Sequence, residues 1–194
     1  MQERLFHLDT ALLTPRTVIR RLREEDGDAV YQLVYPNLSW LADLSSPWNT
    51  SIHTLADAHG YVRLQLAAWL KQEAYGFGIW DKDQAKLIGL LHLDRIDWQL
   101  PKGELAFFVA PEFSRKGLMT EVLFKVIAFA FEELGLEKIK LSLDVDNYAG
   151  QRLARKCGFR REGDLRMERR KPGGELVDML LMAAYATDFV ALEN

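Results

Sequence analysis

Hydrophobic and polar positions in the N-terminal half predict a strand followed by two helices. Thr17 to Leu22 is short, β-branched and apolar, which is typical of a strand. Glu25 and Asp26 then begin a helix that runs through Tyr35, and Pro36 ends it. Residues 37–54 show no clear period and are expected to be irregular or only briefly helical. Helical spacing returns from about Leu55 to Gln72, which predicts a second helix.

The pattern then changes to that of a sheet. Tyr75 to Trp80 and Lys86 to Arg95 are aromatic and branched runs joined by four polar residues, which predicts a hairpin. Gly103 to Ala110 makes a third strand, closed by Pro111. An apolar stripe then predicts a helix from Gly117 to Leu134, with Gly135 as its C-terminal stop.

The C-terminal part alternates strands with a helix. A strand is expected at Lys138 to Asp144, a short helix at Asn147 to Cys157, and strands at Phe159 to Asp164 and Glu175 to Met182. No internal repeat or linker divides the chain. We therefore predict an α/β (α+β) fold with one domain over residues 1–194, in which helices flank a mixed, mostly antiparallel central sheet of six or seven strands.

Composition narrows the classes of function. With 194 residues and 48% hydrophobic content, the chain can bury one substantial core. The net charge of −3 offers no general attraction for nucleic acid, so DNA is not an expected partner. The single cysteine, Cys157, cannot form an intramolecular disulfide, which favours the cytoplasm. The sequence lacks an apolar run of roughly 20 residues that could cross a membrane, and its four histidines lack the clustered spacing of a metal site.

Two segments carry a resemblance to a known family. They are Glu104 to Glu121, ELAFFVAPEFSRKGLMTE, and Asn147 to Gly163, NYAGQRLARKCGFRREG. Together they resemble the GNAT superfamily of N-acetyltransferases, in particular its RimJ/RimL type, which acetylates the N-termini of ribosomal proteins. The resemblance implies acetyl-CoA as the acetyl donor and a sheet that splays between strands 103–110 and 138–144. The sequence departs from the family at Ser114, Met119 and Gly150.

The first motif makes physical sense as a phosphate site. A helix N-terminus presents unpaired amides and roughly half a positive charge, which suits a pyrophosphate, and Gly117 lets backbone approach the phosphates closely. The residues predicted to hold the pyrophosphate are Arg115, Lys116, Gly117, Leu118, Met119 and Thr120. The same turn is also compatible with an ordinary solvated loop.

The remaining donor-binding residues follow from the resemblance. It implies that backbone NH groups around Phe107 to Val109, including those of Phe108 and Val109, bind the pantetheine arm and polarise the thioester carbonyl, an oxyanion-type contact. Asn147 would lie beside that arm, although it can also simply cap its helix. Lys156 could reach the outer phosphate of the cofactor, or belong to a solvated face.

Acetyl transfer needs a neutral amine and benefits from an acid near the leaving thiolate. Glu104 matches the acidic position of the family and is the predicted base. Tyr148, next to Asn147, is the predicted acid, whereas many relatives have a serine at the position of Gly150. His92 and Asp94 share one face of a strand and could act together as the general base instead. They are also compatible with polar residues on the surface of the sheet that have no catalytic role. Cys157 is expected to pack as a small hydrophobe.

Several alternatives stay open. The acceptor could be a protein N-terminal amine, a polyamine or an antibiotic amine, and the resemblance places its recognition near Trp40, Trp48, His53 and Tyr75. A non-catalytic acyl-CoA binding or sensing module is the second hypothesis, motivated by the departures from the family motif. Nucleic-acid binding through the arginines of residues 160–170 is disfavoured by interleaved acids. Either a monomer or a homodimer fits.

Overall fold

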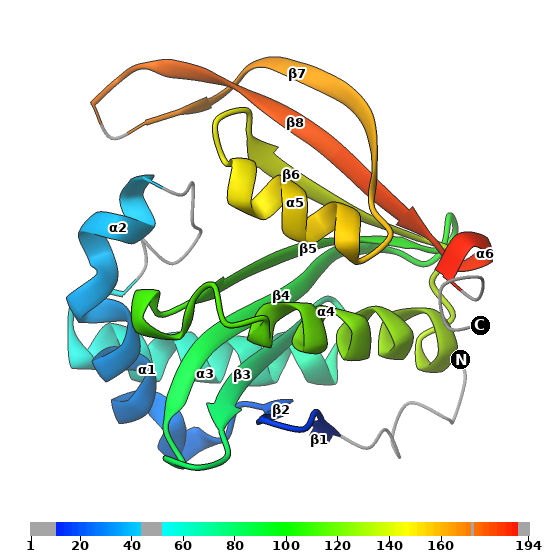
Figure 1. The fold of residues 1–194 in the computed structure, drawn as a ribbon. Coiled ribbons are helices and arrows are strands. Elements are labelled where there is room, and N and C mark those ends of the chain that lie inside the picture. The colour runs from blue at the N-terminus through cyan, green and yellow to red at the C-terminus, as the bar shows by residue number, and fades with distance from the viewer. Residues whose placement is uncertain (1–10, 44–51, 172, 190–194) are drawn as a thin grey trace.

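A computed structural model describes residues 11–43, 52–171 and 173–189 (Figure 1). Its centre is an eight-stranded sheet with the order β1-β2-β3-β4-β5-β6-β8-β7. The strands are β1 Ala11–Leu13, β2 Thr17–Arg21, β3 Tyr75–Asp81, β4 Leu87–Asp97, β5 Lys102–Val109, β6 Lys138–Asp144, β7 Arg160–Arg170 and β8 Leu176–Tyr185. Among these described strands only the β5–β6 pair is parallel, which confirms the predicted mixed, mostly antiparallel sheet.

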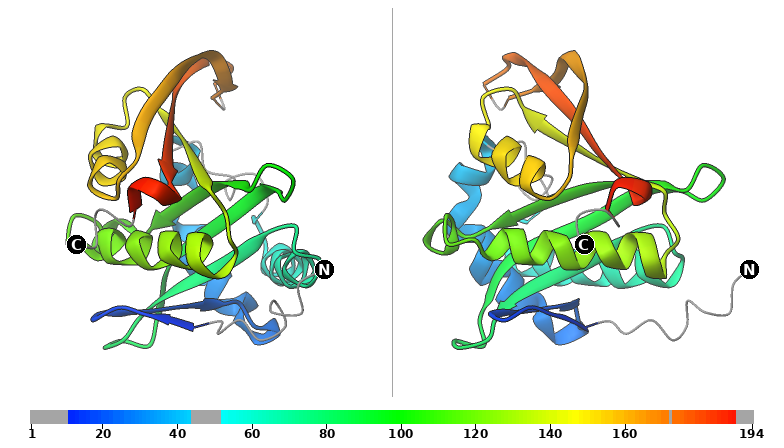
Figure 2. Two further views of the ribbon diagram at one scale, coloured as in Figure 1. Left: turned by 90° about the vertical axis from the view of Figure 1, so that its right-hand side faces the viewer. Right: turned by 45° about the vertical axis from the view of Figure 1, so that its right-hand side comes forward.

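Helices cover both faces of the sheet (Figure 2). The α-helices are α1 Gly27–Val34, α2 Leu38–Asp43, α3 Leu55–Leu70, α4 Leu118–Ala128, α5 Tyr148–Lys156 and α6 Ala186–Phe189. On one face α3 packs so closely that a Cβ on Gly76 of β3 would lie 2.4 Å from Gln65 Oε1. On the other face Phe77 of β3 packs against Phe129, which follows α4, with ring centroids 5.6 Å apart. The sheet is therefore buried between two helical layers.

The sheet splays between β5 and β6, as the resemblance implies. Their pairing covers only Lys102–Glu104 against Lys138–Lys140. Beyond that point β5 stays paired with β4 up to Val109, while β6 stays paired with β8 up to Asp144. The two strands diverge toward their C-terminal ends (Figure 1). One edge of β5 therefore loses its strand partner at mid-sheet.

The strand count of six or seven was too low. β1 is a three-residue strand with no alternation to reveal it, and it exists because it pairs with β2. β7 extends to Arg170 although none of the residues in its sequence, RREGDLRMERR, is buried. As an edge strand it can be polar on both faces, so hydrophobic alternation does not mark it. Its extent is set by pairing with β8.

The long helix predicted for residues 117–134 is not uniform. The α-helical hydrogen bonding ends at Ala128, and Phe129–Glu133 form a π-helical turn in which the Leu134 amide donates to the Phe129 carbonyl at 3.1 Å. Gly135 follows with φ of 71°, the left-handed stop that was predicted.

The other helical predictions need smaller changes. The expected helix at residues 25–35 is a 3-10 turn, η2 Glu24–Asp26, followed by α1, and the helix at residues 55–72 ends at Leu70. Residues 37–54 are briefly helical in their described part, where η3 Tyr35–Asn37 leads into α2. None of the described helices is long and apolar enough to cross a membrane.

Candidate acetyl-donor and acceptor site

The loop between β5 and α4 is shaped by two left-handed residues. After the 3-10 turn η5 Pro111–Phe113, Arg115 has φ of 58° and Gly117, which begins α4 as its N-cap, has φ of 78°. The amides of Thr120 and Glu121 already donate to the Gly117 carbonyl. Within the described chain, the amides of residues 115–119 donate no hydrogen bond. They form a row of donors at a helix N-terminus, which fits an anion.

Side chains around this row leave it accessible. Arg115 and Lys116 are exposed and add positive charge, whereas Leu118 and Met119 are buried at 4% and 8% exposure. Met119 therefore packs into the core, where it does not crowd the donors. Gly117 is exposed, and a Cβ built on it would point toward Arg16, 3.5 Å from Nη2. The loop thus fits the pyrophosphate of a nucleotide-type cofactor despite its departure from the family motif.

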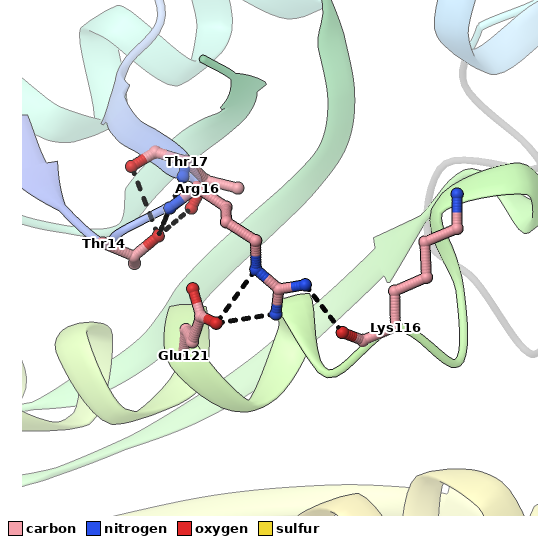
Figure 3. Close-up of polar contacts among 5 residues, drawn as sticks. All are labelled: Thr14, Arg16, Thr17, Lys116 and Glu121. Carbon is pink, nitrogen blue, oxygen red and sulfur yellow. Dashed lines mark hydrogen bonds and ion pairs between the residues drawn. The ribbon is translucent and has the colours of Figure 1, made fainter. Parts of the chain in front are cut away.

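Arg16 contacts this loop, and sequence reasoning missed it. It lies just before β2, and its Nη1 donates to the Lys116 carbonyl at 2.9 Å (Figure 3). Its Nε and Nη2 both donate to Glu121 Oε1, at 3.0 and 2.6 Å. The Thr14 hydroxyl in turn accepts from the Arg16 amide at 3.2 Å. Arg16 and Glu121 are 105 positions apart, so no local pattern could pair them.

Backbone donors also line the free edge of β5. The Ala110 amide donates to Ile88 of β4 at 2.8 Å. Amides alternate in direction along a strand, so the Phe108 amide also points toward β4, whereas those of Phe107 and Val109 point toward the diverging β6. The Val109 amide therefore faces the free edge of β5, whereas the amide of Phe108, the other predicted residue, does not. Phe108 is a core residue whose ring packs 6.4 Å from that of Trp40.

Glu104 lies where β5 and β6 separate. Its Oε1 accepts from Ser142 Oγ of β6 at 3.2 Å, and its Oε2 accepts from Arg95 Nη1 at 2.8 Å. Asp94 lies directly opposite it on β4. Burial raises the pKa of Asp94, the Glu104 charge adds to the rise, and the Arg95 charge opposes it. The result is a pair of carboxyl groups bounded by one arginine and one hydroxyl, of which sequence reasoning identified Glu104 and Asp94.

His92 faces the same side of the sheet as Asp94 but has a different partner. Its Nε2 hydrogen bonds the hydroxyl of Tyr61 on α3, and the two rings stack at 5.6 Å. Burial lowers the pKa of His92 to about 4. The predicted His92–Asp94 pair is therefore replaced by a buried His92–Tyr61 pair, and its low pKa makes His92 a weak base.

The turn after β6 holds the second motif. Asn147 caps α5, because its Oδ1 accepts from the Gly150 amide at 2.9 Å. A Cβ on Gly150 would lie 2.8 Å from Asn147 Nδ2, so the family serine has no room here without moving Asn147. Tyr148 is 63% exposed, and among the described contacts none joins it to Glu104. The structure therefore does not bring the predicted base and acid together through a direct contact.

The remaining candidates are spread over the fold. Lys156 is exposed on α5, while Cys157 is buried and its pKa is raised to about 12 by that burial. Tyr75 is a core residue, 1% exposed, on the face packed against Phe129, so it does not recognise an acceptor directly. His53 is at the turn before α3. Trp48 lies outside the described residues.

A cavity of about 500 Å³ lies beside the end of β6. Asp144, Asp146 and Asn147 line it from one side, and Lys171, Glu175 and Asp178 from the β7–β8 hairpin. A group of three or more His, Cys, Asp or Glu residues suited to a metal does not occur among the described residues.

Comparisons with known proteins all identify acetyltransferases as similar to this chain. A model of the acetyltransferase (GNAT) domain matches residues 16–160. An uncharacterized N-acetyltransferase, YoaA of Bacillus subtilis, is 30% identical over 161 residues, 80% of this chain and 85% of YoaA. A spermidine N(1)-acetyltransferase of Vibrio cholerae is 34% identical over 82 residues, 42% of this chain and 47% of that protein. The solved complex of RimL, a ribosomal L7/L12 alpha-N-protein acetyltransferase, with coenzyme A has a similar fold, with a TM-score of 0.84 and 19% identity over 90% of this chain and 96% of RimL.

Proposed function

The chain belongs to the GNAT family of acetyltransferases and transfers acetyl from acetyl-CoA to an amine, and we propose that Glu104 is the base that prepares that amine. One observation carries the proposal: Glu104 is a partly exposed carboxylate at the fork between β5 and β6, where the free β5 edge begins.

The donor would be held by backbone. The amides of residues 115–119 would bind the pyrophosphate, and Arg115 and Lys116 would add charge beside it. The amides of Phe107 and Val109 would face the pantetheine arm and its thioester carbonyl, where a fixed donor stabilises developing negative charge. Acetyl-CoA supplies an activated acyl group with a thiolate as its leaving group. Asn147 and Lys156 remain proposed contacts at the α5 side.

Glu104 would act on the acceptor. An amine reaches the site as an ammonium ion at neutral pH, and it must lose a proton before its nitrogen can attack. Oε1 and Oε2 of Glu104 are held by Ser142 and Arg95, so the carboxylate is fixed in orientation at the fork. The neutral amine then attacks the thioester carbon, the C–S bond breaks, and Tyr148 is the proposed proton source for the thiolate. The surplus proton of the new amide would return through solvent to Tyr148, and Glu104 would release its proton to solvent.

We propose a protein N-terminal amine as the acceptor, by analogy with RimL, whose fold this chain shares over most of its length. The match to the spermidine acetyltransferase covers less than half of either protein. It makes a polyamine the second candidate. Action in the cytoplasm stays a prediction.

The test is a thiol-release assay with acetyl-CoA. Peptides with free N-termini, the same peptides blocked at the N-terminus, and spermidine serve as acceptors. We expect turnover with the free peptides only; turnover with spermidine alone would reject the N-terminal acceptor. That result would not reject acetyl transfer to an amine as the reaction.

A pair of matched variants tests the base. Glu104→Gln removes the proton acceptor while keeping the shape of the side chain, so turnover should fall by roughly 10²–10⁴-fold with the acetyl-CoA affinity retained. Glu132→Gln makes the same chemical change at an exposed position of the π-helical turn and should leave turnover unchanged. Equal activity of both variants would remove Glu104 from the mechanism.

A further inference from the structure

Arg16 joins two parts of the proposed pyrophosphate site. One side of its guanidinium holds the Lys116 carbonyl in the loop, and the other holds the carboxylate of Glu121 in the first turn of α4 (Figure 3). Its own backbone is anchored, because its amide donates to Thr14 Oγ1 and its carbonyl accepts from the Lys82 amide at 3.1 Å. The loop is therefore fastened to the β2 end of the sheet.

The contact with Lys116 fixes the orientation of one proposed donor. A trans peptide is planar, so the carbonyl of Lys116 and the amide of Gly117 point in opposite directions. The described chain has no cis peptide bond. Since Arg16 holds that carbonyl on its own side, the Gly117 amide must point away from Arg16. It joins the row of unpaired amides at residues 115–119.

The orientation would otherwise be poorly determined. Glycine populates positive and negative φ about equally, so rotation of the peptide between Lys116 and Gly117 meets little steric resistance at Gly117. No other hydrogen bond to the Lys116 carbonyl occurs among the described residues. Arg16 is thus the group that selects one orientation.

Charge gives Arg16 a second effect on the same site. Glu121 lies in the first turn of α4, where a carboxylate would repel a bound phosphate. Its Oε1 is paired with Arg16, and its Oε2 is buried without a partner. The arginine therefore neutralises an acid next to the row of amides.

We propose that Arg16 is a positioning residue for the pyrophosphate of acetyl-CoA, which turns the Gly117 amide toward the ligand by holding the Lys116 carbonyl. The proposal rests on the proposed function, because it assumes that the pyrophosphate binds at this loop. It assigns a binding role to a residue 100 positions away from that loop in the sequence.

The experiment compares two ligands by calorimetric titration and competition. Acetyl-CoA carries the pyrophosphate, whereas S-acetylpantetheine carries the same thioester and arm without it. In Arg16→Ala the affinity for acetyl-CoA should fall about tenfold, the effect of roughly one hydrogen bond to a charged group. The affinity for S-acetylpantetheine should not change. Arg63→Ala, which removes an exposed arginine from α3, is the matched control and should bind both ligands normally.

A double variant separates the two effects of Arg16. If Arg16 acts only by neutralising Glu121, then Glu121→Gln in the Arg16→Ala background would restore acetyl-CoA affinity fully, which would overturn the proposal. We expect affinity to stay well below that of the wild type, because the peptide remains unheld. Arg16→Lys, which keeps the charge and a donor, should lie between the wild type and Arg16→Ala, and it serves as the test if Arg16→Ala does not fold.

Two further outcomes would also overturn the proposal. One is unchanged acetyl-CoA affinity in Arg16→Ala, and the other is an equal loss for both ligands, which would indicate a general structural effect. Failure of the wild type to bind acetyl-CoA is a different result. It would reject the proposed donor site itself.

Discussion

Gly117 offers a quantitative test of the loop, because its backbone and its surroundings can be separated. Its φ is 78°, and an added Cβ would lie 3.5 Å from Arg16 Nη2, an ordinary contact. The Gly117→Ala substitution therefore causes no internal clash. Its cost to folding is the left-handed conformation, about 1 kcal/mol, which lowers the Tm of a chain of this size by about 2–4 °C. The strained φ would, however, favour rotation of the peptide between Lys116 and Gly117, which would turn the Gly117 amide away from the proposed phosphate site.

Gly135→Ala is the matched control for this strain. Gly135 has φ of 71° and nothing within 4 Å of an added Cβ, so the same substitution should cost about the same free energy of unfolding. It follows the far end of the helix, about 27 Å from Gly117 at 1.5 Å per residue. It should not affect acetyl-CoA binding.

Thermal unfolding with and without acetyl-CoA measures both effects. Without ligand the two variants should lose similar Tm. With saturating acetyl-CoA, Gly135→Ala should gain as much Tm as the wild type, because a ligand that binds only the folded state stabilises it by mass action. Gly117→Ala should gain less, by about 1.4 kcal/mol of stabilisation for each tenfold loss of affinity. An equal gain in both variants would refute the placement of the pyrophosphate at Gly117.

Three further predictions concern Cys157, His92 and Gly150. The Cys157 thiol, with its pKa raised to about 12 by burial, should not react with Ellman's reagent until the protein unfolds, and Cys157→Ala should retain turnover in the thiol-release assay. Burial lowers the pKa of His92 to about 4 in the folded protein, below its ordinary value of 6.5, so the unfolded state binds the proton more tightly. The free energy of unfolding is therefore unaffected by this group above pH 6.5. It falls by roughly 3 kcal/mol as the pH drops toward 4. Urea unfolding at pH 7 and pH 4.5 should show this loss in the wild type and a smaller one in His92→Gln. Gly150→Ser, rather than restoring an acid, should displace the Asn147 cap and cost about 1 kcal/mol of stability, measured by the same unfolding; an unchanged stability with faster turnover would contradict this.

The sequence by itself determined the elements whose cause is local. The apolar residues after Gly117 recur at helical spacing, and those in residues 138–144 alternate as in a strand. Each pattern predicts the element because the buried positions follow its period. Gly135 was predicted as the stop of that helix and has the left-handed backbone such a stop needs, whereas the left-handed backbone of Gly117 was not predicted. The two family motifs indicated both the open sheet and the acetyl donor, because they lie on the elements that border the opening.

Only the tertiary structure decided the features that depend on contacts between distant segments. The polar edge strand β7 is fixed by its pairing with β8, and the partner of His92 is Tyr61 on a helix rather than its neighbour Asp94. The link from Arg16 to Glu121 spans 105 positions. A hydrogen bond of this kind depends on where two elements pack, and packing is set by the whole core. Periodicity in the sequence shows which face of each element is buried, but it does not show which residue of another element that face will meet.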